Sequence, residues 1–262
     1  MKRLLFPCLA VLLAGGLSAQ QKEGKVIYLR TVQMQMTFAT GNGEPQTQTQ
    51  TRTNKFELNF ANNQMSWKQM EDEIQDENVG GGNMVFRTIG AGPDDVTFCD
   101  FSQAKRVEQR DFMDKQFLIT DSIQKNTWKL TEETKTILNH LCRKATSQRI
   151  GKRMTMGIQN GKMERKEVDD TASLIAWFTT DIPVPVGPEV QGQLPGIVLE
   201  YESNGGRTNY KALEIIAKPD MSAIKEPTKG KKVTRTQFQE ETRKMMEEMQ
   251  RNGGGQFRMR AN

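Results

Sequence analysis

The sequence predicts a mainly β protein, a curved antiparallel sheet or partial barrel followed by one C-terminal helix. Segments with apolar residues at alternate positions recur along the chain, and residues 26–38 are the longest of them. Turn-forming pairs such as Asn62-Asn63 and Asn160-Gly161 separate these segments. The alternating helix and strand patterns that build a parallel sheet are not visible, so antiparallel pairing is expected.

The first predicted strand covers residues 25–39. Residues 40–51 contain Gly, Asn, Gln and Thr but no large apolar residue, which predicts a flexible loop. Alternating apolar residues at 56–60, followed by Met65 and Trp67, predict a hairpin that turns at Asn62-Asn63.

The middle of the chain predicts many short strands. Residues 71–83 are acidic and glycine-rich, and they predict a solvated loop because they lack the ligand spacing of a calcium site. The next strands are predicted at residues 84–89, 96–101, 116–120, 128–130, 137–145, 154–158 and 174–178. The last of these is apolar on both faces, as in a central strand. Residues 197–201 and 210–217 predict a final hairpin.

The C-terminal part predicts a helix at residues 236–251. Thr236 and Gln239 have the spacing of a capping box, and Phe238, Met245 and Met249 fall on one face. The predicted organisation is a signal peptide (1–19), a β-rich domain (20–220), a linker with the amphipathic helix (221–252) and a disordered tail (253–262).

The N-terminus predicts export. Lys2 and Arg3 precede an apolar run at residues 4–16, and Ala19 ends a short stretch of small residues before Gln20. An uncleaved anchor is the alternative, but the run is shorter than the ~20 residues that a bilayer requires. We expect a periplasmic or extracellular protein, with outer-membrane association left open and no transmembrane segment after cleavage. Basic and acidic residues are interleaved, so no nucleic-acid partner is expected.

Two cysteines remain after the signal is removed. Cys99 and Cys142 predict a disulfide, because export places the chain in an oxidising compartment. The alternative is two free buried thiols.

One motif is specific enough to suggest a relationship. Its residues are Trp177, Ile182, Pro183, Gly187, Pro188, Leu194, Pro195, Gly196 and Ile197. With an upstream block that ends in Cys142-Arg143-Lys144-Ala145, they resemble the GLPGLI family of exported bacterial proteins. Gln193 stands where the motif has its first glycine, and Asn139-His140 replaces the usual Gly-Tyr. The family has no established biochemical function, so the resemblance implies export and fold but no catalytic residues.

Turn chemistry explains the motif locally. Pro195 followed by Gly196 predicts a type II turn with a positive φ at the glycine. Pro183, Pro185 and Pro188 cannot donate to a sheet, which predicts an edge or crossover segment. Two interpretations stay open: a rigid lip around a binding groove, or a corner that starts a strand.

Other candidates for chemistry are few. His140 is the only histidine, and Cys142 lies two residues away, so a thiol–imidazole pair is conceivable beside the simpler reading of a strand histidine. The 15 methionines, several near the C-terminus, could bind Cu(I) or fill an apolar surface. We predict no catalytic, cofactor-binding or metal-binding residues and no cofactor.

These observations predict a non-enzymatic envelope protein that binds an apolar ligand or an outer-membrane partner. Its fold would be similar to the half-barrels of periplasmic lipoprotein carriers, by analogy alone. The alternatives are an interaction protein without a small ligand and an exported hydrolase. A large apolar cavity favours the first hypothesis, a filled core with an exposed apolar helix face the second, and a cleft at His140 the third.

Overall fold

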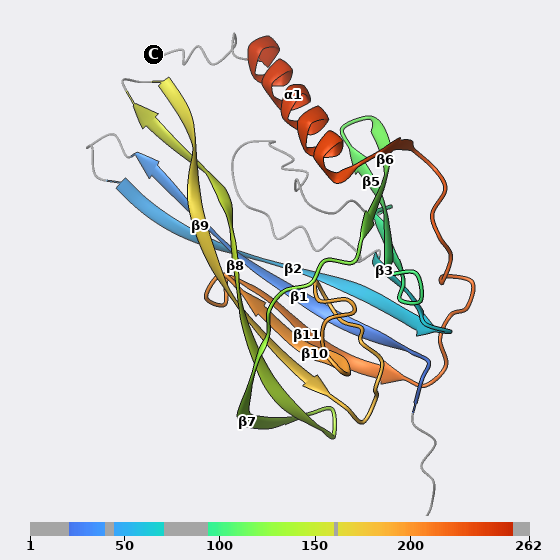
Figure 1. Ribbon diagram of the computed structural model, residues 1–262. Helices are drawn as coiled ribbons and strands as arrows, with labels where there is room; N and C mark the ends of the chain where they lie inside the picture. The colour runs from blue at the N-terminus through green and yellow to red at the C-terminus, as the bar shows by residue number, and fades with distance from the viewer. Residues whose placement is uncertain (1–20, 40–44, 71–93, 160–161, 254–262) are drawn as a thin grey trace, which may run out of the picture.

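The computed structural model describes residues 21–39, 45–70, 94–159 and 162–253. In these ranges twelve strands form one open, curled sheet, and a single helix follows them (Figure 1). The strand order is β12-β6-β5-β4-β3-β2-β1-β11-β10-β9-β8-β7. All neighbours pair antiparallel except β12 and β6, which are parallel. The predicted class, a mainly β curved antiparallel sheet with a C-terminal helix, is confirmed.

The strands vary greatly in length. Their bounds are β1 Gly24–Ala39, β2 Pro45–Ala61, β3 Gln64–Gln69, β4 Val96–Asp100, β5 Lys105–Phe112, β6 Lys115–Ser122, β7 Lys129–Ile137, β8 His140–Gln159, β9 Lys162–Thr179, β10 Ile197–Ser203, β11 Thr208–Ile216 and β12 Lys231–Val233. The hairpins β1–β2 and β8–β9 extend well beyond the shorter strands between them (Figure 1).

One face of the sheet, called the inner face below, carries the main core. Alternate residues of β1 and β2 supply Val26, Tyr28, Phe56 and Leu58, and all four are buried. Since side chains alternate across a strand, the period-two pattern of the sequence places these residues together.

Tight turns close the hairpins where short polar residues can take a positive φ. Asn62 and Asn63 have φ values of 53° and 60° between β2 and β3, as predicted. Leu138 and Asn139 have 48° and 65° and divide β7 from β8. The prediction of one continuous strand over residues 137–145 is therefore wrong. Leu138 hid the turn, because a bulky apolar residue rarely adopts a positive φ.

Two further strand predictions need correction. Residues 45–51, predicted to be loop, belong to β2, which stays in register with β1 as far as Ala39 opposite Pro45. Threonine is a β-branched residue that favours a strand, and it occurs at alternate positions in this segment. The strand β5 was not predicted, because its sequence carries mostly charged residues. Predictions for residues 1–19, 40–44, 71–83, 84–89, 160–161 and 254–262 fall outside the described residues.

The helix α1 spans Arg235–Gly253 and confirms the predicted helix. Its cap lies two residues earlier than predicted: Gln237 N donates to Thr234 Oγ1 (3.2 Å) and Thr234 N donates to Gln237 Oε1 (2.9 Å). Phe238 meets Phe117 of β6 edge to face at 5.2 Å, and Met245 packs against the same cluster. No helix in the described ranges is both long and apolar enough to cross a membrane.

Candidate functional site

The motif lies in the connection between β9 and β10, residues 180–196, which returns to the sheet instead of pairing as a strand. Ile197 N donates to Ile182 O (3.1 Å), Val198 N to Val186 O (2.9 Å) and Gly192 N to Pro185 O (2.7 Å). Pro183, Pro185 and Pro188 lie outside the strands, but β9 and β10 are neighbouring antiparallel strands, so the segment is a long hairpin connection and the predicted edge or crossover is wrong. We call this segment the β9–β10 connection.

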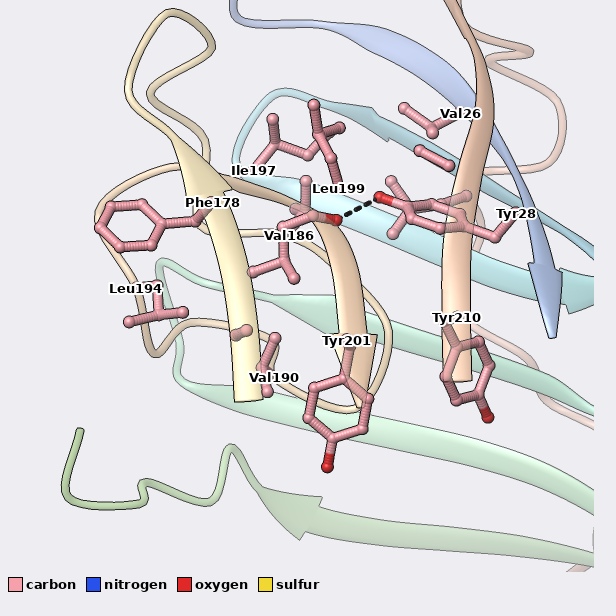
Figure 2. Close-up of a cluster of buried hydrophobic side chains, with 14 of the residues drawn as sticks. Val26, Tyr28, Phe178, Val186, Val190, Leu194, Ile197, Leu199, Tyr201 and Tyr210 are labelled. Carbon is pink, nitrogen blue, oxygen red and sulfur yellow. Dashed lines mark hydrogen bonds between the residues drawn. The ribbon is translucent and has the colours of Figure 1, made fainter. Parts of the chain in front are cut away.

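Apolar side chains of the connection fill the inner face. Ile182, Val186, Val190 and Leu194 are each at most 4% exposed and belong to the main core cluster. Figure 2 shows Val186, Val190 and Leu194 beside side chains of β9 and β10. The side chains of the connection therefore fill the space in which a binding groove would lie. The segment is part of the core, and it is not the rim of a groove.

Beside these side chains, a buried hydrogen bond joins two strands that are 170 residues apart in the chain and separated by β11 in the sheet. The Tyr28 hydroxyl of β1 donates to the carbonyl of Val198 in β10 at 2.7 Å, as Figure 2 shows. Burial raises the pKa of Tyr28 far above its usual value of 10, so the phenol stays protonated. The hydroxyl therefore stays available as the donor of this bond between β1 and β10.

Aromatic rings continue the core next to Tyr28. Phe56 stacks on Trp67 with centroids 5.0 Å apart, and Trp67 meets Tyr210 at 5.8 Å. The Tyr210 hydroxyl donates to Glu189 Oε1 at 3.3 Å. Glu189 belongs to the connection and has a φ of 61°, a conformation that side-chain-bearing residues adopt at a cost. This contact ties the exposed turn of the connection to the aromatic cluster.

Two glycines of the motif are required for reasons of space. A Cβ on Gly196 would collide with the carbonyl of Thr179, and one on Gly187 would lie 2.6 Å from the Val198 Cβ. Gly196 is not among the residues with a positive φ, so the predicted type II turn is wrong. Gly192, at 72°, is the glycine of this connection that needs the left-handed conformation.

The departure at Gln193 has a clear structural role. Its Oε1 accepts hydrogen bonds from the backbone N of Asn126 (3.1 Å) and from Trp128 Nε1 (2.9 Å). A glycine could make neither bond. Gln193 therefore anchors the segment before β7 to the connection.

Trp177 of the motif packs against the main core and also contacts two lysine side chains. Lys135 Nζ lies 4.2 Å from the ring centroid and 2.8 Å from Glu200 Oε1. Lys144 Nζ lies 5.8 Å from the same ring. Cation–π contact and the ion pair hold β7, β8, β9 and β10 together here.

His140 and Cys142 do not form an activated thiol. His140 Nδ1 lies 3.0 Å from Asp181 Oδ2, and the buried Cys142 Sγ faces the His140 backbone oxygen at 3.6 Å. Burial raises the pKa of Cys142 to about 11, which keeps the thiol protonated at neutral pH. The pair has the sequence proximity of a catalytic dyad but not its chemistry.

The predicted disulfide is not formed. Cys99 and Cys142 are free and buried, and burial raises the pKa of Cys99 to about 12. Cys99 is in β4 and Cys142 in β8, and six strands separate these two in the sheet order. The alternative of two free buried thiols is the one that the structure bears out.

A buried charge network, which the sequence did not reveal, lies on β5. Glu108 is fully buried and pairs with Arg106 (2.7 Å), Arg110 (3.0 Å) and Arg235 at the start of α1. Burial raises the pKa of Glu108, but the three guanidinium groups outweigh it and hold the pKa at about 2. Arg106 also reaches Gln191 of the connection at 3.4 Å. In the sequence, the alternation of Arg106, Glu108 and Arg110 was the signal that could have indicated this network.

One hollow among the described residues is lined by both charged and apolar side chains. It has a volume of about 470 Å³ and lies between β2–β5 and the segment that leads to β12, with Lys68, Gln109, Lys225 and Glu226 in its lining. It lies away from the β9–β10 connection. The described residues hold no group of three His, Cys, Asp or Glu side chains that could bind a metal.

Comparison with known proteins agrees with this picture. Residues 128–200 match the profile of a family described as "Protein of unknown function (Porph_ging)". The match covers the connection, and the resemblance to GLPGLI-type exported proteins is confirmed. No curated protein matches the chain.

Similar solved structures indicate the fold alone. Two structures of PNGF-II, in C2 and P21 space groups, are 14% and 15% identical, with TM-scores of 0.50 and 0.49. Each comparison covers 85% of this chain but 33% of the other, so the chain spans about a third of the length of PNGF-II. The class defined here is an open, curled antiparallel β protein whose motif closes its own core.

Proposed function

We propose that this chain is an exported, non-enzymatic protein of the cell envelope that acts by docking onto a partner protein. The observation that carries the proposal is the filled inner face. Ile182, Val186, Val190 and Leu194 occupy the space in which a carrier would hold an apolar ligand. Export is supported by Lys2, Arg3 and the apolar run before Ala19.

Exposed apolar residues support a protein partner. Seven large hydrophobic side chains of the described residues are exposed, and four of these, Leu130, Leu138, Leu141 and Ile150, belong to β7, β8 and their turn. Leu141 is 63% exposed and Ile150 is 84% exposed. These four residues lie on the two strands at one edge of the sheet and in their turn, and we infer that the region around Leu141 contacts a partner protein.

The hydrolase alternative has weaker support. Burial raises the pKa of the Cys142 thiol beside His140 to about 11, which keeps it protonated at neutral pH, and the hollow near Lys68 and Glu226 does not include His140. An interaction role needs neither an activated nucleophile nor a cavity.

Photo-crosslinking in the native envelope tests the proposal. A photoreactive residue at Leu141 is expected to yield a discrete crosslinked product with another protein. The matched control is the same residue at Leu213 of β11, which is 44% exposed and lies outside β7 and β8. Equal products at both sites, or none at Leu141, would contradict docking through this edge.

A further inference from the structure

The outer face of the sheet, opposite the inner face, carries the hollow that is bordered by a segment between two strands. Residues 217–230 run from the end of β11 to β12 and cross β2, β3, β4 and β5 on this face (Figure 1). The volume of the hollow is about 470 Å³, and small-molecule sites commonly have volumes of ~300–1,000 Å³. It is therefore large enough for a compact organic ligand.

The register of the strands builds the sheet side of this outer-face hollow. Glu57 of β2 pairs with Lys68 of β3. Lys68 also pairs with Val96 of β4, which in turn pairs with Gln109 of β5. Directly paired residues point to the same face of a sheet, so these four side chains form one row, and all four line the hollow.

The segment of residues 217–230 is attached to the sheet at three points. The backbone N of Asp220 donates to Asn59 Oδ1 at 2.9 Å, and Ile224 packs against apolar side chains of β2 and β4. Gly230 lies so close to β6 that a Cβ there would be 2.8 Å from a backbone carbon atom. Because the segment is held near both of its ends, the fold itself forms the hollow.

The charges around the hollow leave an excess of ammonium groups. Both acidic residues of its lining are already paired with lysines outside the lining. Glu57 pairs with Lys25 at 2.7 Å, and Glu226 pairs with Lys105 at 2.7 Å. The lining also contains three lysines that have no ion-pair partner among the residues that the structure describes: Lys68, Lys225 and Lys229. Ammonium groups around one hollow repel one another, so an anion between them would be attracted.

Neutral hydrogen-bond donors lie beside these lysines. The lining includes Ser66 and Thr228, which carry hydroxyl groups. Asn59 pairs with Ser66 across β2 and β3, and its buried Nδ2 has no hydrogen-bond partner in the described part of the chain. A buried donor without an acceptor costs free energy, so an acceptor oxygen next to Ser66 would be stabilising.

We propose that the outer-face hollow binds a small organic phosphate. A phosphate group carries between one and two negative charges at neutral pH and has three strong acceptor oxygens, which suits the three lysines and the hydroxyls. Lysine is a common phosphate ligand because its ammonium group is a compact point charge. The hollow is many times larger than the ~30 Å³ share of one water molecule, so a bare phosphate would leave most of it empty. The carbon part of the ligand would contact Val96 and Pro227, which also line the hollow. This site lies apart from Leu141 and does not depend on the proposed docking function.

Isothermal titration calorimetry of the purified protein tests the site with three probes at low salt. Phenyl phosphate should bind, and its affinity should fall as salt is added, because salt screens the lysine charges. Benzyl alcohol, which has the ring without the charge, should not bind. Inorganic phosphate should bind more weakly than phenyl phosphate, because it lacks the carbon part. The proposal is overturned if phenyl phosphate does not bind, or if either of the other probes binds equally well.

Lysine variants locate the binding. The double variant Lys225→Gln with Lys229→Gln removes two exposed charges from the lining and should weaken phenyl phosphate binding by about tenfold or more. Lys68→Gln should weaken it by a similar factor. Lys211→Gln is the matched control, because Lys211 is an exposed lysine of β11 that does not line the hollow. An affinity of the double variant equal to that of Lys211→Gln would overturn the proposal. If Lys68→Gln alters the circular dichroism spectrum, the double variant decides.

Discussion

The inner face of the sheet is closed in two different ways at its two ends. Over β9 and β10 the β9–β10 connection supplies apolar side chains such as Val190 and Leu194. Over β5 and β6 the closure comes from α1, with Phe238 against Phe117 and Arg235 against the buried Glu108. The first closure depends on packed volume, and the second on a balance of buried charges. The two ends should therefore respond differently to mutation and to pH.

Removing the buried charge should have the largest effect. Glu108→Gln leaves Arg106, Arg110 and Arg235 without the carboxylate that they share, so we expect a loss of about 3–5 kcal/mol in unfolding free energy. Urea denaturation measures it. The control is Glu132→Gln, whose partner is Arg143 and whose side chain is 96% exposed, with an expected change below about 0.5 kcal/mol. Similar values for both variants would show that the network adds little.

Removing a buried apolar side chain from the β9–β10 connection should give the second-largest loss of stability. Leu194→Ala removes a 4% exposed side chain from the core, with an expected cost of about 2–5 kcal/mol. Leu213→Ala, at a 44% exposed position, should cost less than about 1 kcal/mol. A loss at Leu194 no greater than at Leu213 would mean that the connection is not part of the core.

Acid should affect the charged end selectively. The folded pKa of Glu108 is about 2, below its ordinary value of 4.5, so its stabilisation is present above pH 4.5 and is lost as the pH falls through 2. The stability difference between wild type and Glu108→Gln should therefore shrink by about 3 kcal/mol over that range. The difference between wild type and Leu194→Ala should stay constant. Urea titrations at several pH values measure both stability differences. If the difference between wild type and Leu194→Ala also shrank with acid, the two ends of the sheet would not respond separately to pH.

The smallest expected effect lies within the motif. Gly196→Ala places a methyl group against the Thr179 carbonyl, and we expect a loss of about 1–3 kcal/mol. Gly151→Ala is the control, because a Cβ there meets no atom within 4 Å. Thermal unfolding compares the two. A neutral Gly196→Ala would show that the turn has room to shift.

The sequence predicted those elements in which local pattern and tertiary role agree. Alternation at Val26 and Tyr28 reflects real burial, and Asn62-Asn63 has the chemistry that its turn requires. Prediction from the sequence failed where contacts between residues far apart in the chain determine the structure. The partners of Glu108 include Arg235, which lies 127 residues away in the chain. The requirement for glycine at position 196 comes from the nearby backbone carbonyl of Thr179. No local signal encodes either contact.

The cysteines show the same limit. Compartment and composition favoured a disulfide between Cys99 and Cys142, but strand order decides whether two thiols meet. Likewise, the motif residues around Leu194 were recognisable as a unit, yet the sequence left open whether they border a groove or fill a core. The structure resolves this because their side chains lie in the main cluster.

Native mass spectrometry of the protein purified from its own envelope tests the central claim most directly. If the β9–β10 connection fills the inner face, the polypeptide should carry no apolar small molecule, although an anionic molecule bound in the outer-face hollow is compatible with the claim. Leu194→Ala, which opens space in the same region, provides a comparison under identical conditions. An added mass corresponding to a lipid or another apolar molecule on the unmodified chain would contradict the account.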